Sequence, residues 1–66
     1  MNPEIEFKSK LVVLIGQYFG NATATLYEEA YSKMPVEFVE KSSEKLLTEH
    51  LGSERARGLI QAAKQR

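Results

Sequence analysis

Apolar and charged side chains alternate along this chain every three to four residues, the repeat expected for one face of an α-helix. Over residues 3–19 the apolar positions form two stripes: Ile5, Val12, Ile15 and Phe19 in the first, and Phe7, Leu11, Leu14 and Tyr18 in the second. The pattern predicts a helix over residues 3–19. The β-branched residues within 11–15 also permit a strand. The segments on either side of 11–15 are charged and lack turn residues, which favours the helix.

Glycine and proline divide the remainder of the chain into three further helices. Gly20 suits the end of the first helix, and Asn21 is a good N-cap for the next. Pro35 restricts the residue before it and marks a second break. Gly52 followed by Ser53 gives a third, again a C-cap glycine and then an N-cap. The predicted helices cover residues 22–33, 35–51 and 54–64.

The apolar spacing also predicts which faces of the last two helices are buried. In the third helix the inward positions come from the set Val36, Val39, Ser43, Leu46, Leu47 and His50. In the fourth they are Ala56, Leu59, Ile60 and Ala63. No segment is recognisable as a repeat of another. The expected fold is all-α, a compact bundle of four short helices forming one domain over residues 1–66.

Size and charge narrow the possible functions. The chain has 66 residues, nine Lys and Arg balanced by nine Glu, and no cysteine. A domain this small buries a modest share of its surface, and without disulfides it depends on helix packing or on association with another chain. A net charge of zero gives no overall attraction to nucleic acid or to an anionic membrane. The acidic start and the absence of a long apolar run predict a cytoplasmic protein without a membrane span.

The residues that could perform chemistry do not form a recognisable site. His50 is the only histidine, no metal-ligand spacing surrounds it, and its place near the end of the third helix suits the helix dipole. Every acidic residue is a glutamate placed as on a solvated helix face, and no nucleophile triad or phosphate-binding glycine loop is present. The sequence predicts a non-enzymatic protein with no catalytic residue, metal, cofactor or small-molecule substrate.

A protein-interaction surface is the function that the pattern favours. Covering both apolar stripes of the first helix requires more partners than one neighbouring helix supplies. Three short helices could leave one stripe open for a second chain, most simply in a homodimer. Alternatively, the first helix is central and is enclosed on all sides within one monomer. The interface residues predicted from the first reading are Phe7, Leu11, Leu14, Tyr18, Tyr27 and Tyr31.

Nucleic-acid binding is the alternative function. The C-terminal segment 53–66 carries a local excess of positive charge, from Arg55, Arg57, Lys64 and Arg66. The last two helices could then form a helix-turn-helix whose second helix reads DNA. That helix has few polar side chains able to reach base edges, and basic residues at the end of a helix also complement its dipole. The sequence therefore ranks nucleic acid below protein as a partner.

Residues 14–63 resemble a small helical domain at the C-termini of some bacterial signalling proteins, including serine/threonine kinases and response-regulator-type proteins. The similarity lies in the segments LIGQYFGNA (14–22), LLTEHL (46–51) and ERA (54–56), with Leu26 and Ala30 between them. The resemblance implies an accessory regulatory or oligomerisation module that has no catalytic residues.

Overall fold

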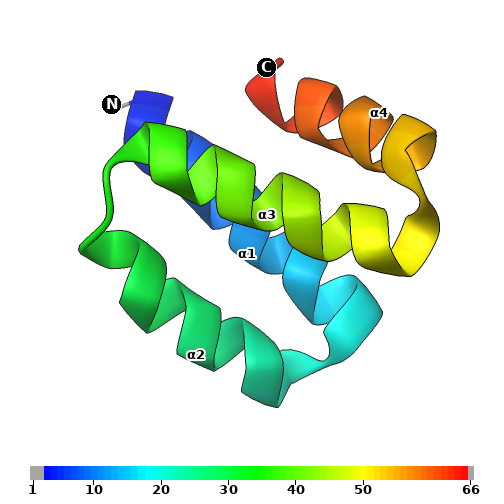
Figure 1. Cartoon of the computed structure of the whole chain (residues 1–66). Helices are drawn as coiled ribbons and strands as arrows, with labels where there is room; N and C mark the ends of the chain where they lie inside the picture. Colours follow the sequence, from blue (N-terminus) through cyan, green and yellow to red (C-terminus); the bar gives the residue numbers. More distant parts are fainter. Residues whose placement is uncertain (1–2, 66) are drawn as a thin grey trace.

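The computed structural model describes residues 3–65 and is built from four helices within that range (Figure 1). They are α1 (Pro3–Phe19), α2 (Asn21–Ser32), α3 (Val36–Leu51) and α4 (Ser53–Lys64). No strand occurs among the described residues, so the all-α prediction is confirmed and the strand alternative for 11–15 is wrong. The predicted ends of the helices agree with the observed ends to within one residue.

Single glycines join the helices of each pair. Gly20 lies between α1 and α2 with φ 97° and ψ 162°, and Gly52 lies between α3 and α4 with φ 93° and ψ 155°. Asn21 and Ser53 were expected as N-caps, but they are the first residues of their helices, and neither helix has a side-chain cap. With one residue available for the reversal, the backbone must enter a region that only glycine adopts readily.

The α1–α2 and α3–α4 hairpins use equivalent positions 32 residues apart. Pro35 follows Pro3 at this distance, and Gly52 follows Gly20. The same offset relates three pairs of buried residues, Phe7 with Val39, Leu11 with Ser43 and Ile15 with Leu47. The two hairpins therefore share their turn positions and the buried row of their first helices, whereas buried Ile60 of α4 corresponds to exposed Glu28 of α2.

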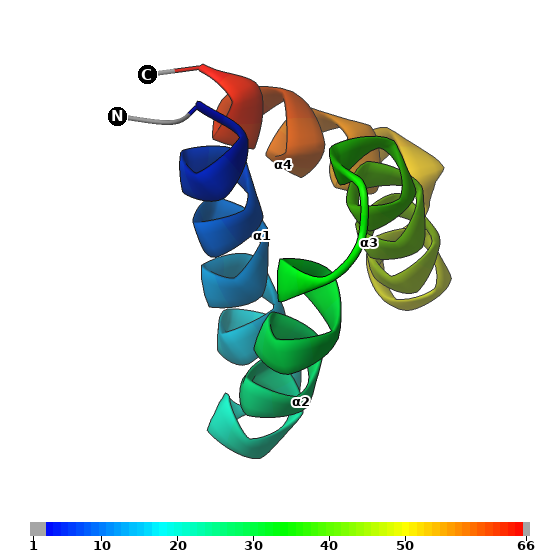
Figure 2. The ribbon, with the colours of Figure 1, turned by 90° about the vertical axis from the view of Figure 1, so that its left-hand side faces the viewer.

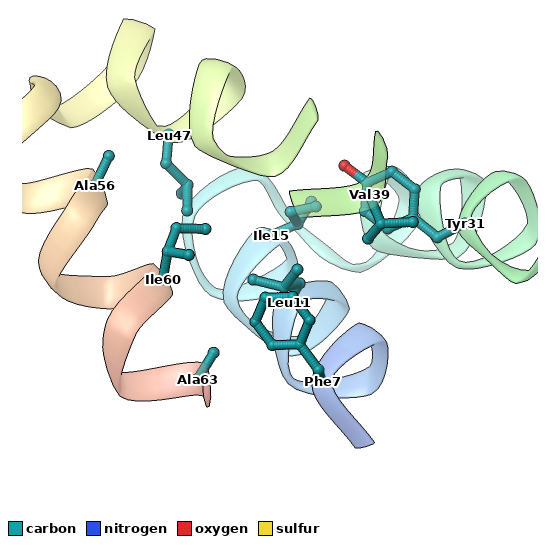
Figure 3. Packing of buried hydrophobic residues seen from close by; sticks show 9 residues of the cluster. All are labelled: Phe7, Leu11, Ile15, Tyr31, Val39, Leu47, Ala56, Ile60 and Ala63. Carbon is teal, nitrogen blue, oxygen red and sulfur yellow. The ribbon is translucent and has the colours of Figure 1, made fainter. Parts of the chain in front are cut away.

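Helix α1 contacts each of the other three helices, and it contributes Phe7, Leu11 and Ile15 to the core. In Figure 2, α3 and α4 lie to the right of and above α1, and α2 returns beside its lower half. Figure 3 shows the side chains of α1 pointing toward those of α3 and α4. The buried apolar residues are Phe7, Leu11, Ile15, Tyr31, Val39, Leu47, Ala56, Ile60 and Ala63. The inward faces predicted for the last two helices are confirmed in large part.

A hydroxyl cluster joins the two hairpins where α2 meets α3. The Tyr31 hydroxyl donates to Ser42 Oγ at 3.1 Å and accepts from Ser43 Oγ at 3.1 Å. Ser43 is fully buried and Tyr31 nearly so, and each polar atom has a partner. These bonds satisfy groups whose burial would otherwise destabilise the fold. Within residues 3–65, no helix has the length and apolar character required to cross a membrane.

Candidate protein-interaction surface

Three of the predicted interface residues belong to the core of the single chain. Phe7 and Leu11 point at α3 and α4, and the exposed fraction of Leu11 is 0% (Figure 3). Tyr31 is 2% exposed and bonded to Ser42 and Ser43. Their side chains are covered within the single chain, since both α3 and α4 contact α1, on which Phe7 and Leu11 share a row with Ile15. In the single chain they therefore offer a partner little surface.

The other predicted interface residues, Leu14, Tyr18 and Tyr27, are half-buried at the borders of the core. The Tyr27 ring lies edge-on to Tyr31 with 5.4 Å between centroids. Tyr18 lies edge-on to the ring of His50 at 6.1 Å. The Tyr18–His50 pair joins α1 to α3, whereas Tyr27 and Tyr31 pack against each other along α2, and both pairs have the edge geometry that such rings favour. Leu14, Tyr18 and Tyr27 therefore act first as packing residues and offer a partner only their outer edges.

The exposed apolar surface of α1 lies on the side opposite the core. We call this surface the outer face; it consists of Ile5, Ser9, Val12, Val13 and Gly16. At about 100° per residue Ser9, Val13 and Gly16 project roughly opposite to Leu11, whereas Ile5 and Val12 lie toward α2, and none of the five is charged. Ile5 is 63% exposed and Val13 is 59% exposed. In Figure 2 no helix lies to the left of α1, the side away from α3.

Two apolar grooves run along the outer face, one on each side of a ridge formed by Val13 and Ser9. The α1–α2 groove, of about 450 Å³, is bordered by Ile5, Val12, Glu28 and Ser32 among others. The α1–α4 groove, of about 350 Å³, is bordered by Leu14, Gln17, Leu59, Ala62 and Ala63 among others. Ser9 and Val13 line both grooves. An apolar ridge between two apolar grooves suits the packing of a helix.

Small residues set the depth of the α1–α2 groove. At Gly16 the two helices approach so closely that an added Cβ would lie 3.3 Å from Ala24 Cβ. The groove continues past this point over Val12, Gly16 and Ala24 toward the α1–α2 turn. Along the outer face the side chains therefore differ in size, from the large Ile5 near the start of α1 to Gly16, which has no side chain, near its end.

Lysine ammonium groups close the N-terminal ends of both grooves. Lys8 Nζ donates to the carbonyl oxygen of Met34 at 2.6 Å, and Lys10 Nζ donates to that of Gln65 at 2.8 Å. These bonds hold the α2–α3 connection and the end of α4 against α1. Glu28 lines the α1–α2 groove and forms no ion pair with any residue between 3 and 65. The outer face is therefore uncharged, with charges of both signs along its border.

The basic residues predicted as a nucleic-acid surface are partly neutralised by α3. Lys64 Nζ lies 2.9 Å from Glu40 Oε2, and Arg57 Nε lies 3.9 Å from Glu44 Oε2. Arg55 is exposed, and Arg66 lies outside the described residues. Two of the four basic residues therefore lie beside glutamates of α3, which lowers the positive potential around them.

The single histidine of the sequence, His50, packs against aromatic side chains of α1. His50 lies in the last turn of α3, as predicted, and its ring is tilted against Phe19 with 4.8 Å between centroids. It therefore packs the end of α3 on the end of α1. Among residues 3–65 there is no group of three histidine, cysteine or acidic side chains arranged to hold a metal ion.

Comparison with protein-family models, curated proteins and solved structures finds no significant match to this chain. The description of the site therefore depends on the geometry alone. Sequence reasoning had assigned Ile5 and Val12 to an apolar stripe, but it missed the outer face as a unit. The signal that could have revealed it is the set of uncharged residues at positions 5, 9, 12, 13 and 16.

Proposed function

We propose that this chain is a non-enzymatic protein-interaction module that binds its partner through the outer face of α1. The observation that supports this is the exposure of Ile5 and Val13 beside two apolar grooves. Single exposed apolar residues are common on proteins and need no function. Here they are contiguous with concave apolar surface, and such patches mark interaction sites.

The resemblance to accessory domains of bacterial signalling proteins agrees with this role. A module of this kind would regulate or assemble the proteins that contain it, and it would need a binding surface but no reactive side chains. Nucleic-acid binding through Arg55, Arg57, Lys64 and Arg66 is the weaker proposal, since Glu40 and Glu44 compete for two of these residues.

Site-specific photocrosslinking in the cells that produce the protein tests the proposed function. A photoreactive phenylalanine analogue at position 13 should form adducts with a partner chain. The matched control places the same group at Phe38, which is 58% exposed on α3 and borders neither groove. Adducts from position 38 in equal yield, or none from position 13, would show that the outer face is not the binding surface.

A further inference from the structure

We infer that the partner of the outer face is a second copy of this chain, with the two α1 helices antiparallel about a two-fold axis. This inference rests on the proposed function and specifies the partner and its orientation. Shape, charge and the order of side-chain sizes along α1 each favour this arrangement.

The shape of the outer face is complementary to itself. Ridge and grooves are present on the same surface, so the ridge of one copy can enter a groove of the other. Ile5 is the largest side chain of the face and Gly16 the smallest, and they lie at opposite ends. Antiparallel helices place Ile5 of each copy over Gly16 of the other. Parallel helices would instead set Ile5 against Ile5 and leave a gap at Gly16.

Placing Ile5 of each copy over Gly16 of the other also determines which residues lie near the two-fold axis. When Ile5 is level with Gly16 of the second copy, Ser9 is level with Val12, so each small residue again faces a larger one. Ser9 of one copy then lies about 4.5 Å along the axis from Ser9 of the other, whereas the two Ile5 residues lie about 16 Å apart.

Charge along the border of the face supports the same orientation. Within one chain, the Gly16–Ala24 approach and the Lys8–Met34 bond place Glu28 beside Val12. Antiparallel pairing about the two-fold axis brings the α1–α2 grooves to the same side, so Glu28 of each copy lies near Lys8 of the other. Lys8 has further N–H donors beyond the one used by Met34. Parallel pairing would bring Lys8 near Lys10 instead, which like charges disfavour.

Disulfide formation between single-cysteine variants tests the orientation, because the natural chain contains no cysteine. Ser9→Cys should form a disulfide-linked dimer under mild oxidation. Ile5→Cys alone should not, since the two thiols are too far apart to join. A mixture of Ile5→Cys and Gln17→Cys should give the mixed dimer. Gln17 replaces Gly16 here because a side chain at 16 would press on Ala24. Phe38→Cys is the exposed control and should not be linked.

Charge reversal gives an independent measurement in the protein without cysteine. Glu28→Lys should raise the dimer dissociation constant about fivefold, because two exposed ion pairs are lost. Adding Lys8→Glu restores the pairs with reversed polarity and should recover most of the affinity. Lys8→Glu also removes the bond to Met34, so circular dichroism must show that the double variant keeps its helices; a folded double variant that recovers no affinity would overturn the Lys8–Glu28 pairing.

The outcomes separate this inference from the proposed function. An Ile5→Cys dimer that forms as readily as the Ser9→Cys dimer would overturn the antiparallel arrangement. A purified chain that stays monomeric at all concentrations, with no Ser9→Cys dimer, would overturn self-association. The proposed function would still hold in that case if the crosslinker at position 13 captured a different protein. It would fail together with the inference if position 13 captured nothing.

Discussion

Gly20 and Gly52 adopt nearly the same backbone conformation at equivalent positions of the two hairpins, with φ values of 97° and 93°. In each case a single residue reverses the chain between a longer helix and a shorter one, α1 and α2 in the first hairpin and α3 and α4 in the second. The two hairpins share these turns and the buried row of their first helices, while their surfaces differ. Only the first hairpin has an uncharged outer face.

Replacing either glycine with alanine should destabilise the protein through backbone strain. Nothing lies within 4 Å of a Cβ added at Gly20 or Gly52, so side-chain crowding makes no contribution. We expect Gly20→Ala and Gly52→Ala each to lower the free energy of unfolding by about 1–3 kcal/mol. Chemical denaturation followed by circular dichroism measures this. Equal stability of wild type and both variants would contradict the assigned conformation.

Gly58→Ala is the matched control and should act in the opposite direction. Gly58 lies inside α4 with an ordinary helical conformation and open space around its Cα. Alanine there reduces the entropy that the unfolded chain loses on folding, so stability should rise by about 1 kcal/mol. The same denaturation experiment reports the change. A loss of stability would indicate a packing constraint at this position.

Tyr31→Phe should measure how much the hydroxyl cluster between α2 and α3 contributes to the stability of the fold. The substitution leaves the fully buried Ser43 hydroxyl without its bonding partner. We expect a loss of about 1–3 kcal/mol in the free energy of unfolding. The double variant Tyr31→Phe/Ser43→Ala removes both polar groups and should be destabilised by less than the sum of the single variants. Strict additivity in the double-mutant cycle would contradict the coupling.

Two substitutions on opposite sides of α1 should separate folding from association. Leu11→Ala opens a cavity in the core and should destabilise the domain by about 2–5 kcal/mol, much of what a chain of this size possesses. Val13→Glu should leave the melting of the monomer nearly unchanged but abolish the dimer. Sedimentation equilibrium combined with circular dichroism distinguishes the two effects. A Val13→Glu variant that still dimerises would contradict the role of the outer face.

Oligonucleotide titration should show no strong salt-dependent binding. Lys64 and Arg57 already lie beside glutamates of α3, which lowers the positive potential available to a phosphate backbone. Fluorescence anisotropy with mixed-sequence DNA and RNA at low ionic strength provides the measurement. Tight binding that Arg55→Gln and Lys64→Gln weaken would favour the nucleic-acid alternative instead.

The sequence alone determined the four helices of this protein and where each of them ends. Glycine and proline interrupt a pattern of apolar residues at helical spacing, and these are local properties that act before any packing. The buried rows of α3 and α4, including the unusual buried Ser43, followed from the same spacing. Each of these helices has a single apolar stripe, so only one orientation hides it.

Tertiary structure decided which side of α1 is covered, because that helix has apolar residues around most of its circumference. The spacing of apolar residues cannot predict which side of α1 is buried when more than one side is apolar. The positions of α3 and α4 decide it. These helices cover the row of Phe7, Leu11 and Ile15 and leave Ile5 and Val13 exposed. The close approach of Gly16 to Ala24 and the folding of Lys64 onto Glu40 likewise join residues distant in sequence. Such contacts depend on how the two hairpins dock, and no local pattern encodes that.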